Sequence, residues 1–292
     1  MWYYLTKYQH LPNRNAANNI LLFIFDPSRN HPGLMDRLKA CVGIYNIAKR
    51  NNRIFKILFE PGSYIPDYIE PNMTNWQVEK HDISYSMYES RLISYTGRED
   101  NVFLNSKIRQ YHVYNYRGLD LRLFLRIYNC EELWSKDFNE LFRPSKTLYT
   151  ILQNQQFKEN EYIAVHVRFV NALELAEPKY PGLPLPIEKK HLLIEKCIKA
   201  IKSIEKDNNL PVLIFSDSSL FLKKCGMEED LGKIGHISYN TSREVYEKTF
   251  TDLFMISRAR MVIQLQDNNL YRSAFSRFGA MIGNKPFVFK KI

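Results

Sequence analysis

The amino-acid sequence predicts an α/β protein made of two Rossmann-like domains that face each other across a cleft. Two observations support this. Short apolar runs alternate with amphipathic helical stretches, and the alternation occurs twice, before residue 60 and after residue 161. Such alternation is typical of parallel sheets covered by helices. The length of 292 residues suits two modest domains. We expect an N-terminal domain over residues 1–155 and a C-terminal domain over residues 156–292.

The first alternation is a strand, helix, strand unit. Residues 19–25 are an apolar run that ends at a polar turn, which is typical of a buried strand. Apolar residues at helical spacing predict a helix over residues 36–50, and Asp36 at its start suits the helix dipole. Residues 54–59 are the next expected strand. Residues 61–154 show no comparable pattern.

The second alternation follows a polar run at residues 153–161, which is the expected linker. The strands are expected at residues 162–167, 212–215, 261–265 and 286–289, and the helices at residues 187–204, 219–225, 244–258 and 271–282. This pattern predicts a doubly wound domain. In such sheets, ligands bind beyond the carboxyl ends of the strands.

Composition and charge narrow the class of function. The formal net charge is +10, but it is spread along the chain, and no recognised nucleic-acid-binding motif accompanies it. A nucleotide substrate or a membrane surface fits this charge better than nucleic acid. The four cysteines form no C-x-x-C pair, which indicates a reducing compartment and no zinc site. We expect a cytoplasmic protein, with peripheral association at a membrane as an alternative.

Several common motifs are missing from the sequence. It contains no G-x-x-x-x-G-K-[ST], no G-x-G-x-x-G and no G-x-S-x-G, so P-loop, dinucleotide and common hydrolase signatures are absent. It also has no D-x-D, the metal-chelating signature of many sugar-nucleotide transferases. The junction at residues 31–37, which includes His31, resembles a phosphate cradle with a single glycine.

Candidate functional side chains follow three strands of the second domain. His166 and Arg168 end the first strand, and the guanidinium fork matches a pair of phosphate oxygens. The alternative for Arg168 is a pair with a nearby carboxylate. Ser216 and Asp217 follow the next strand, where a carboxylate suits a ribose diol or purine edge and the alternative is a helix cap. Residues 271–276 begin a helix, whose free N–H groups and hydroxyls suit phosphate.

Taken together, four segments resemble the fucosyltransferase superfamily that includes the α1,6-, nodulation, plant xyloglucan and protein-O-fucosyltransferases. These are residues 33–38 for the Gly-x-Gly-Asn/Asp-Arg-Leu loop, 165–168 for the His-x-Arg motif, 185–191 with 215–218 for the helix and ribose-binding stretch, and 251–260 with 272–276 for the C-terminal nucleotide motif. The resemblance covers residues 155–292 in order and spacing, and residues 1–60 in part. After Arg168, α1,6-type members continue Arg-Thr-Asp-Lys, whereas this chain has Phe169-Val-Asn-Ala172, with Asn171 in place of the Asp.

The resemblance implies a GT-B-like fold, a GDP-fucose donor, a glycan acceptor, inversion at the anomeric carbon, and neither a metal nor another cofactor. It implies that Arg168 holds the β-phosphate and offsets the leaving-group charge. Asp217 and Asp252 would fix ribose or guanine. The other donor-binding residues that we expect are Gly33, Arg37, His166, Ser216, Ser273, Phe275 and Ser276.

An inverting transfer needs a general base for the acceptor hydroxyl. Glu174 and Glu177 lie in the loop after Arg168, and we expect Glu174 ahead of Glu177, with Asp36 as a third candidate. Two alternatives to a fucosyltransferase stay open. One is another GT-B transferase that uses GDP-mannose, a heptose nucleotide or a UDP-sugar. The other is a non-catalytic module that binds a glycan or nucleic acid.

Overall fold

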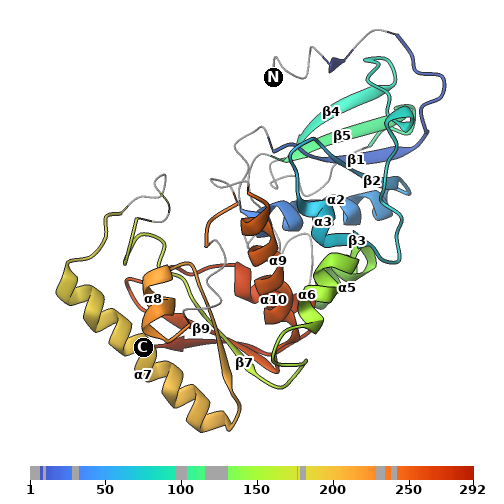
Figure 1. Ribbon diagram of the computed structural model, residues 1–292. Coiled ribbons are helices and arrows are strands. Elements are labelled where there is room, and N and C mark those ends of the chain that lie inside the picture. The colour runs from blue at the N-terminus through green and yellow to red at the C-terminus, as the bar shows by residue number, and fades with distance from the viewer. Residues whose placement is uncertain are drawn as a thin grey trace. The chain divides into compact units, whose positions relative to one another are not determined.

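The computed structural model describes residues 7–8, 11–27, 33–95, 104–115, 131–175, 177, 182–227, 234–237 and 242–292. The chain divides into two compact units, Met1–Arg143 and Pro144–Ile292, each built on its own sheet (Figure 1). The division falls earlier than residue 155, because α6 (Lys146–Gln153) packs against α9 (Arg243–Arg258) of the second unit. His31 and Cys130 lie outside the described residues.

The first unit contains a four-stranded parallel sheet in the order β2-β1-β5-β4. Its strands are β1 (Ile20–Phe25), β2 (Ile54–Phe59), β4 (Ser90–Tyr95) and β5 (Gln110–Asn115). The helix α2 (Leu34–Arg50) connects β1 to β2, which confirms the predicted strand, helix, strand unit. Every residue of β1 is buried, as its unbroken apolar run requires. The strands β4 and β5 lie in the stretch where the sequence shows no clear pattern.

Smaller elements complete the first unit. They are α3 (Ile65–Tyr68), β3 (Ile69–Pro71), the 3₁₀ helix η1 (Lys80–Asp82), α5 (Glu131–Leu141) and β6 (Phe142–Pro144). The strands β3 and β6 pair with each other, and α5 packs against α2. A buried carboxylate of α5, Asp137, accepts hydrogen bonds from Lys49 and Asn46 of α2, which fixes the two helices.

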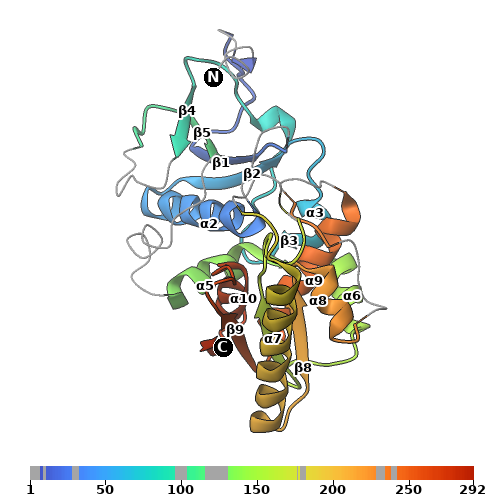
Figure 2. The same ribbon diagram turned by 90° about the vertical axis from the view of Figure 1, so that its left-hand side faces the viewer.

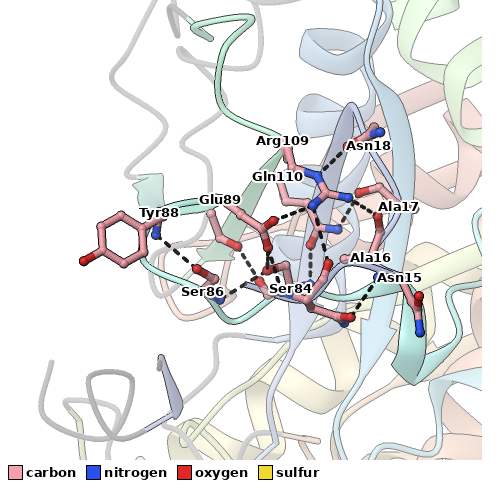
Figure 3. A network of polar contacts seen from close by, with 12 residues as sticks. Asn15, Ala16, Ala17, Asn18, Ser84, Ser86, Tyr88, Glu89, Arg109 and Gln110 are labelled. Carbon is pink, nitrogen blue, oxygen red and sulfur yellow. Dashed lines mark hydrogen bonds and ion pairs between the residues drawn. The ribbon is translucent and has the colours of Figure 1, made fainter. Parts of the chain in front are cut away.

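A network of polar contacts lies at the amino ends of β1, β4 and β5 (Figure 3). Arg109 donates to the backbone oxygen of Ala16, to Asn18 Oδ1 and to Glu89 Oε1. Glu89 Oε2 accepts from Ser84 Oγ at 2.6 Å. These bonds satisfy the partly buried charges and join three segments that are distant in the sequence. The network therefore holds the amino edge of this sheet together.

The second unit contains a four-stranded parallel sheet in the order β10-β9-β7-β8. Its strands are β7 (Ile163–Val167), β8 (Val212–Ser216), β9 (Met261–Gln266) and β10 (Phe287–Lys291). Its further helices are α7 (Ile187–Asn208), α8 (Ser219–Lys224) and α10 (Phe275–Ile282). The predicted strands and helices are confirmed, except that α10 begins at Phe275 and not at residue 271.

Helices cover both faces of this second sheet. The long helix α7 runs beside β7 and β8 (Figure 2). Its buried residues pack with Ile163, Val165 and Val167, which point to one face of β7. His166 points to the other face, where its ring lies near that of Phe275 of α10. None of the helices among the described residues is long and apolar enough to cross a membrane.

Candidate functional site

Polar side chains gather at the carboxyl ends of β7, β8 and β9 in the second unit. Arg168 directly follows β7, and Asp217 directly follows β8. The segment after β9 returns to the same place, because the backbone N–H of Tyr271 donates to the carbonyl of Arg168 at 2.8 Å. The structure thus brings together three of the segments that the sequence analysis selected. This is the edge at which open parallel sheets bind ligands.

The guanidinium of Arg168 lies between two carboxylates. Its Nη2 donates to Glu177 Oε1, and its Nε lies 3.4 Å from Asp217 Oδ2. The side chain is 19% exposed. Across the described residues, Nε has no hydrogen-bond partner although it is buried. Arg168 therefore has the carboxylate partners that the sequence left as an alternative, and it also keeps N–H capacity for a further acceptor.

Asp217 is bound to the backbone that follows Arg168. Its Oδ1 accepts from the N–H of Phe169 at 2.8 Å, and its Oδ2 accepts from the N–H of Val170 at 2.7 Å. Burial raises the pKa of Asp217, against the lowering effect of Arg168 and of these hydrogen bonds. Both carboxylate oxygens are thus engaged with the turn beneath Arg168. A role for Asp217 at ribose or guanine stays a prediction.

The backbone of Val170 has an uncommon conformation. Its φ is +55°, in the left-handed region that β-branched residues rarely adopt. Such a conformation persists only where the surroundings hold it. Here the hydrogen bond from its N–H to Asp217 supplies that hold. The side chain of Val170 is also buried, which further fixes the turn.

The two glutamates of the following loop occupy different places. Glu177 is buried beside Arg168, and burial raises its pKa, with Asp217 adding to the shift and Arg168 opposing it. Glu174 instead accepts from the backbone N–H of Ser219 at 2.7 Å, at the start of α8. The sequence analysis placed Glu174 ahead of Glu177. The structure puts Glu177, and not Glu174, in contact with Arg168, while the catalytic role of either is a prediction.

Two buried polar atoms, one on His166 and one on Ser276, have no hydrogen-bond partner among the described residues. The side chain of His166 is 4% exposed, and its ring centroid lies 6.0 Å from that of Phe275. Burial, and then the charge of Arg168, lower the pKa of His166 to about 3, so its ring is neutral at physiological pH. Within the described part of the chain, neither His166 Nδ1 nor Oγ of the buried Ser276 has a hydrogen-bond partner. Ser276 lies in the first turn of α10.

Ser273 and Ser216 take part in local turns. Ser273 Oγ accepts from the N–H of Phe275 at 3.1 Å. The buried amide of Gln264, in the orientation that satisfies it, donates to Ser273 O at 3.2 Å and accepts from Ser273 N at 2.9 Å. Ser216 Oγ accepts from the N–H of Ser218 at 3.2 Å. These bonds shape the segments that follow β8 and β9.

The remaining candidate residues lie elsewhere. Asp252 on α9 accepts from Lys248 Nζ with both oxygens at 2.6 Å, and burial raises its pKa against the effect of Lys248. Three candidates belong to the first unit, at the start of α2. Gly33 O accepts from the N–H of Asp36 and of Arg37, and its φ of −57° is one that any residue adopts. Asp36 pairs with Lys39, and Arg37 is buried.

No group of three or more His, Cys, Asp or Glu residues that could hold a metal ion occurs among the described residues. At the carboxyl ends of β7 and β8, the positive charge of Arg168 lies beside its two carboxylate partners.

Two α/β units, each with a parallel four-stranded sheet, place this chain in the GT-B-like fold class, and solved fucosyltransferases share the fold. The α1,6-fucosyltransferase NodZ, soaked with GDP-fucose, matches with a TM-score of 0.56 and 13% identity, over 91% of this chain and 92% of its own. NodZ from Bradyrhizobium matches with a TM-score of 0.54 and 13% identity, over 90% and 92%. An Arg-to-Lys mutant of Arabidopsis thaliana FUT1 in complex with GDP matches with a TM-score of 0.57 and 10% identity, over 99% of this chain and 72% of its own.

This structural likeness confirms the predicted fold class. No protein-family model matches the chain, and no curated protein matches it by sequence. At identities of 10% to 13%, the likeness shows the fold and leaves the activity to be argued from the site.

Proposed function

We propose that this chain is an inverting glycosyltransferase that moves fucose from GDP-fucose to a glycan acceptor. The observation that carries the proposal is the placement of Arg168 at the carboxyl end of β7, two residues after His166, whose Nδ1 has no hydrogen-bond partner among the described residues. The shared fold supports it, since one neighbour was soaked with GDP-fucose and another is in complex with GDP.

In this proposal Arg168 binds the β-phosphate of the donor. A planar guanidinium donates to two phosphate oxygens at once, and its charge stabilises the diphosphate as it leaves the sugar. Ser276 Oγ and the first N–H groups of α10 supply further donors, because a helix N-terminus favours an anion. The neutral ring of His166 lies beside the ring of Phe275, the first residue of the same helix.

Glu174 and Glu177 are both candidates for the general base, and we favour Glu177. Its raised pKa places it closer to neutrality, which suits a group that must accept a proton from an acceptor hydroxyl. Glu174 is already engaged as an acceptor for the N–H of Ser219. Asp36, which pairs with Lys39, is the third candidate.

We further propose that the transfer needs no divalent metal, since the charge of Arg168 does at the leaving group what a metal does in other transferases. The chelator EDTA should leave the initial rate unchanged. A rate that disappears with EDTA and returns with Mg²⁺ or Mn²⁺ would contradict this part of the proposal.

The proposal is tested with Arg168→Ala and a panel of nucleotides. At 100 times its dissociation constant, GDP should stabilise the wild-type protein by about 2.7 kcal/mol, and UDP, ADP and CDP should stabilise it less. Arg168→Ala should weaken GDP binding by about 2–5 kcal/mol, because a charged hydrogen-bond partner is lost. Isothermal titration calorimetry and thermal shift measure both effects.

Arg260→Ala is the matched control, since Arg260 is exposed and lies just before β9, at the opposite edge of the same sheet. It should bind GDP like the wild type. Stabilisation by UDP but not by GDP would favour another donor. Full GDP affinity in Arg168→Ala would overturn the assignment of the site, and GDP binding without transfer or donor hydrolysis would favour a non-catalytic module.

A further inference from the structure

We propose that Asn171 is a positioning residue whose side-chain amide holds Glu177 against Arg168; its effect on catalysis rests on the proposed function. The sequence analysis treats Asn171 only as a departure from the α1,6-type pattern. The structure shows it at the centre of the contacts that fix the loop after β7. The hydrogen bonds of Asn171 described below go to Glu177 and Gly182 and not to Arg168 or α10.

The amide of Asn171 makes a reciprocal pair of hydrogen bonds with the backbone of Glu177. Asn171 Oδ1 accepts from the N–H of Glu177 at 2.9 Å, and Asn171 Nδ2 donates to the carbonyl of Glu177 at 3.0 Å. Nδ2 also lies 3.4 Å from the carbonyl of Gly182, to which it donates. The side chain is buried, with 3% exposed. One planar group thus satisfies both backbone groups of Glu177.

An amide suits this pair of bonds, because the pair requires one donor and one acceptor on the same planar group, and Asn has both at any pH. An ionised carboxylate has acceptors and no donor. A carboxylate of the same size would place a second acceptor opposite the carbonyl of Glu177. It would also bury a further negative charge near Glu177 and Asp217, which is unfavourable without a new partner. Asn171→Asp therefore breaks the pair while it preserves the volume of the side chain.

The backbone beside Arg168 and the backbone of Glu177 are fixed by different side chains. Asp217 fixes the backbone N–H groups of Phe169 and Val170, directly after Arg168. Asn171 fixes the backbone of Glu177. Loss of the amide should therefore release Glu177 and leave Arg168 in place. The expected signature is a loss of turnover without a loss of nucleotide affinity.

Amide hydrogen exchange tests the geometry without any measurement of activity. In Asn171→Ala, which removes the acceptor Oδ1, exchange at the Glu177 amide should accelerate by about tenfold, the factor for one net hydrogen bond. The amides of Phe169 and Val170 should keep their wild-type rates, since Asp217 still binds them. Unchanged exchange at Glu177, in a variant whose melting temperature stays near that of the wild type, would overturn the inference.

Kinetics test the consequence for catalysis. Asn171→Asp should lower kcat by about 100-fold, the scale for a misplaced catalytic group, and leave the Kd for GDP within about twofold of the wild type. The acid limb of the kcat profile should move to lower pH as Glu177 leaves its buried place beside Arg168. The control Asn154→Asp changes an exposed amide of the same unit and should leave both values unchanged.

The outcomes separate the two proposals. If Arg168→Ala keeps its affinity for GDP, the proposed function fails, while the exchange data still decide the role of Asn171 in the loop. If Arg168→Ala loses that affinity and Asn171→Asp keeps a wild-type kcat and pH profile, the proposed function survives and the positioning role of Asn171 is wrong.

Discussion

The two sheets each carry a polar cluster around an arginine, but at opposite edges. Arg109 lies at the amino ends of the strands in the first unit, and Arg168 lies at the carboxyl end of β7 in the second. Arg109 donates to two backbone carbonyls and two side chains. Arg168 pairs only with carboxylates among the described residues, and its buried Nε has no hydrogen bond there.

The two clusters also differ at a buried histidine. His112 has a partner at each ring nitrogen, with Tyr8 Oη at 2.6 Å from Nδ1 and Gln110 Oε1 at 3.1 Å from Nε2. His166 has no partner at Nδ1 in the described chain. Burial lowers the pKa of both to about 3, so the shift alone does not separate them. Unsatisfied polar atoms thus distinguish the second cluster, which is the one that we propose binds a ligand.

The largest expected effect comes from a matched pair of carboxylates. Glu177→Gln should reduce transfer by a factor of about 10²–10⁴, the usual contribution of a general base, with little change in stability. Glu89→Gln should leave transfer unchanged and lower the free energy of unfolding by about 1–3 kcal/mol, since Glu89 accepts from Ser84, Asn13 and Arg109. Initial rates and urea unfolding measure the two effects.

Glu174→Gln is the control within the loop. It should weaken the contact with the start of α8 and leave the rate near that of the wild type. A rate lost in Glu174→Gln but kept in Glu177→Gln would reverse the assignment of the base. If Glu89→Gln lost transfer activity while its free energy of unfolding stayed that of the wild type, the distinction between the Arg109 and Arg168 clusters would be wrong.

The histidine pair gives a smaller effect on stability. His112→Phe should cost about 1–3 kcal/mol, because it removes the hydrogen bonds that the buried ring makes with Tyr8 and Gln110. His166→Phe should cost less, because no hydrogen bond to Nδ1 is lost. Thermal unfolding measures both. Equal losses would show that the missing partner at His166 has no energetic meaning.

At neutral pH the smallest effect is the dependence of stability on pH. Each histidine binds a proton near pH 6.5 when unfolded but only near pH 3 when folded. The unfolded state therefore holds more protons between these values, and stability falls as pH drops from about 6.5 toward 3, by up to about 1.4 kcal/mol per pH unit for each ring. His166→Phe should remove the contribution of one histidine to this dependence of the free energy of unfolding on pH. An unchanged slope would show that His166 is charged in the folded protein.

The sequence predicts the fold best where the pattern is strong. The apolar runs at β1 and β7 and the periodic helices α2 and α7 are found as expected. The strands β4 and β5 are missed, because their apolar residues are interrupted by Arg91, His112 and serines. Their place depends on pairing with β1 and on the Arg109 network, which join distant segments.

The site shows the same division. Arg168, Asp217 and the segment that leads into α10 can be predicted from strand ends, since a strand fixes where its next residue lies, although α10 begins later than expected. It does not find the contact between Arg168 and Glu177, which depends on the turn at Val170. A valine with φ of +55° contradicts local preference, and Asp217, distant in sequence, holds it there. The pairing of Asn171 with Glu177 follows from the same turn.

The turn at Val170 also bears on how mutations at this edge are interpreted. Because Asp217 holds a backbone conformation that valine resists, its removal should let the chain relax and move Arg168. A screen that measured only donor affinity would then score Asp217 as a direct ligand. Glycine adopts the same conformation without the steric strain of valine, so Val170→Gly added to an Asp217 variant distinguishes the two explanations. It should restore donor affinity only if the affinity was lost through relaxation of the backbone and not through loss of a direct contact with the donor.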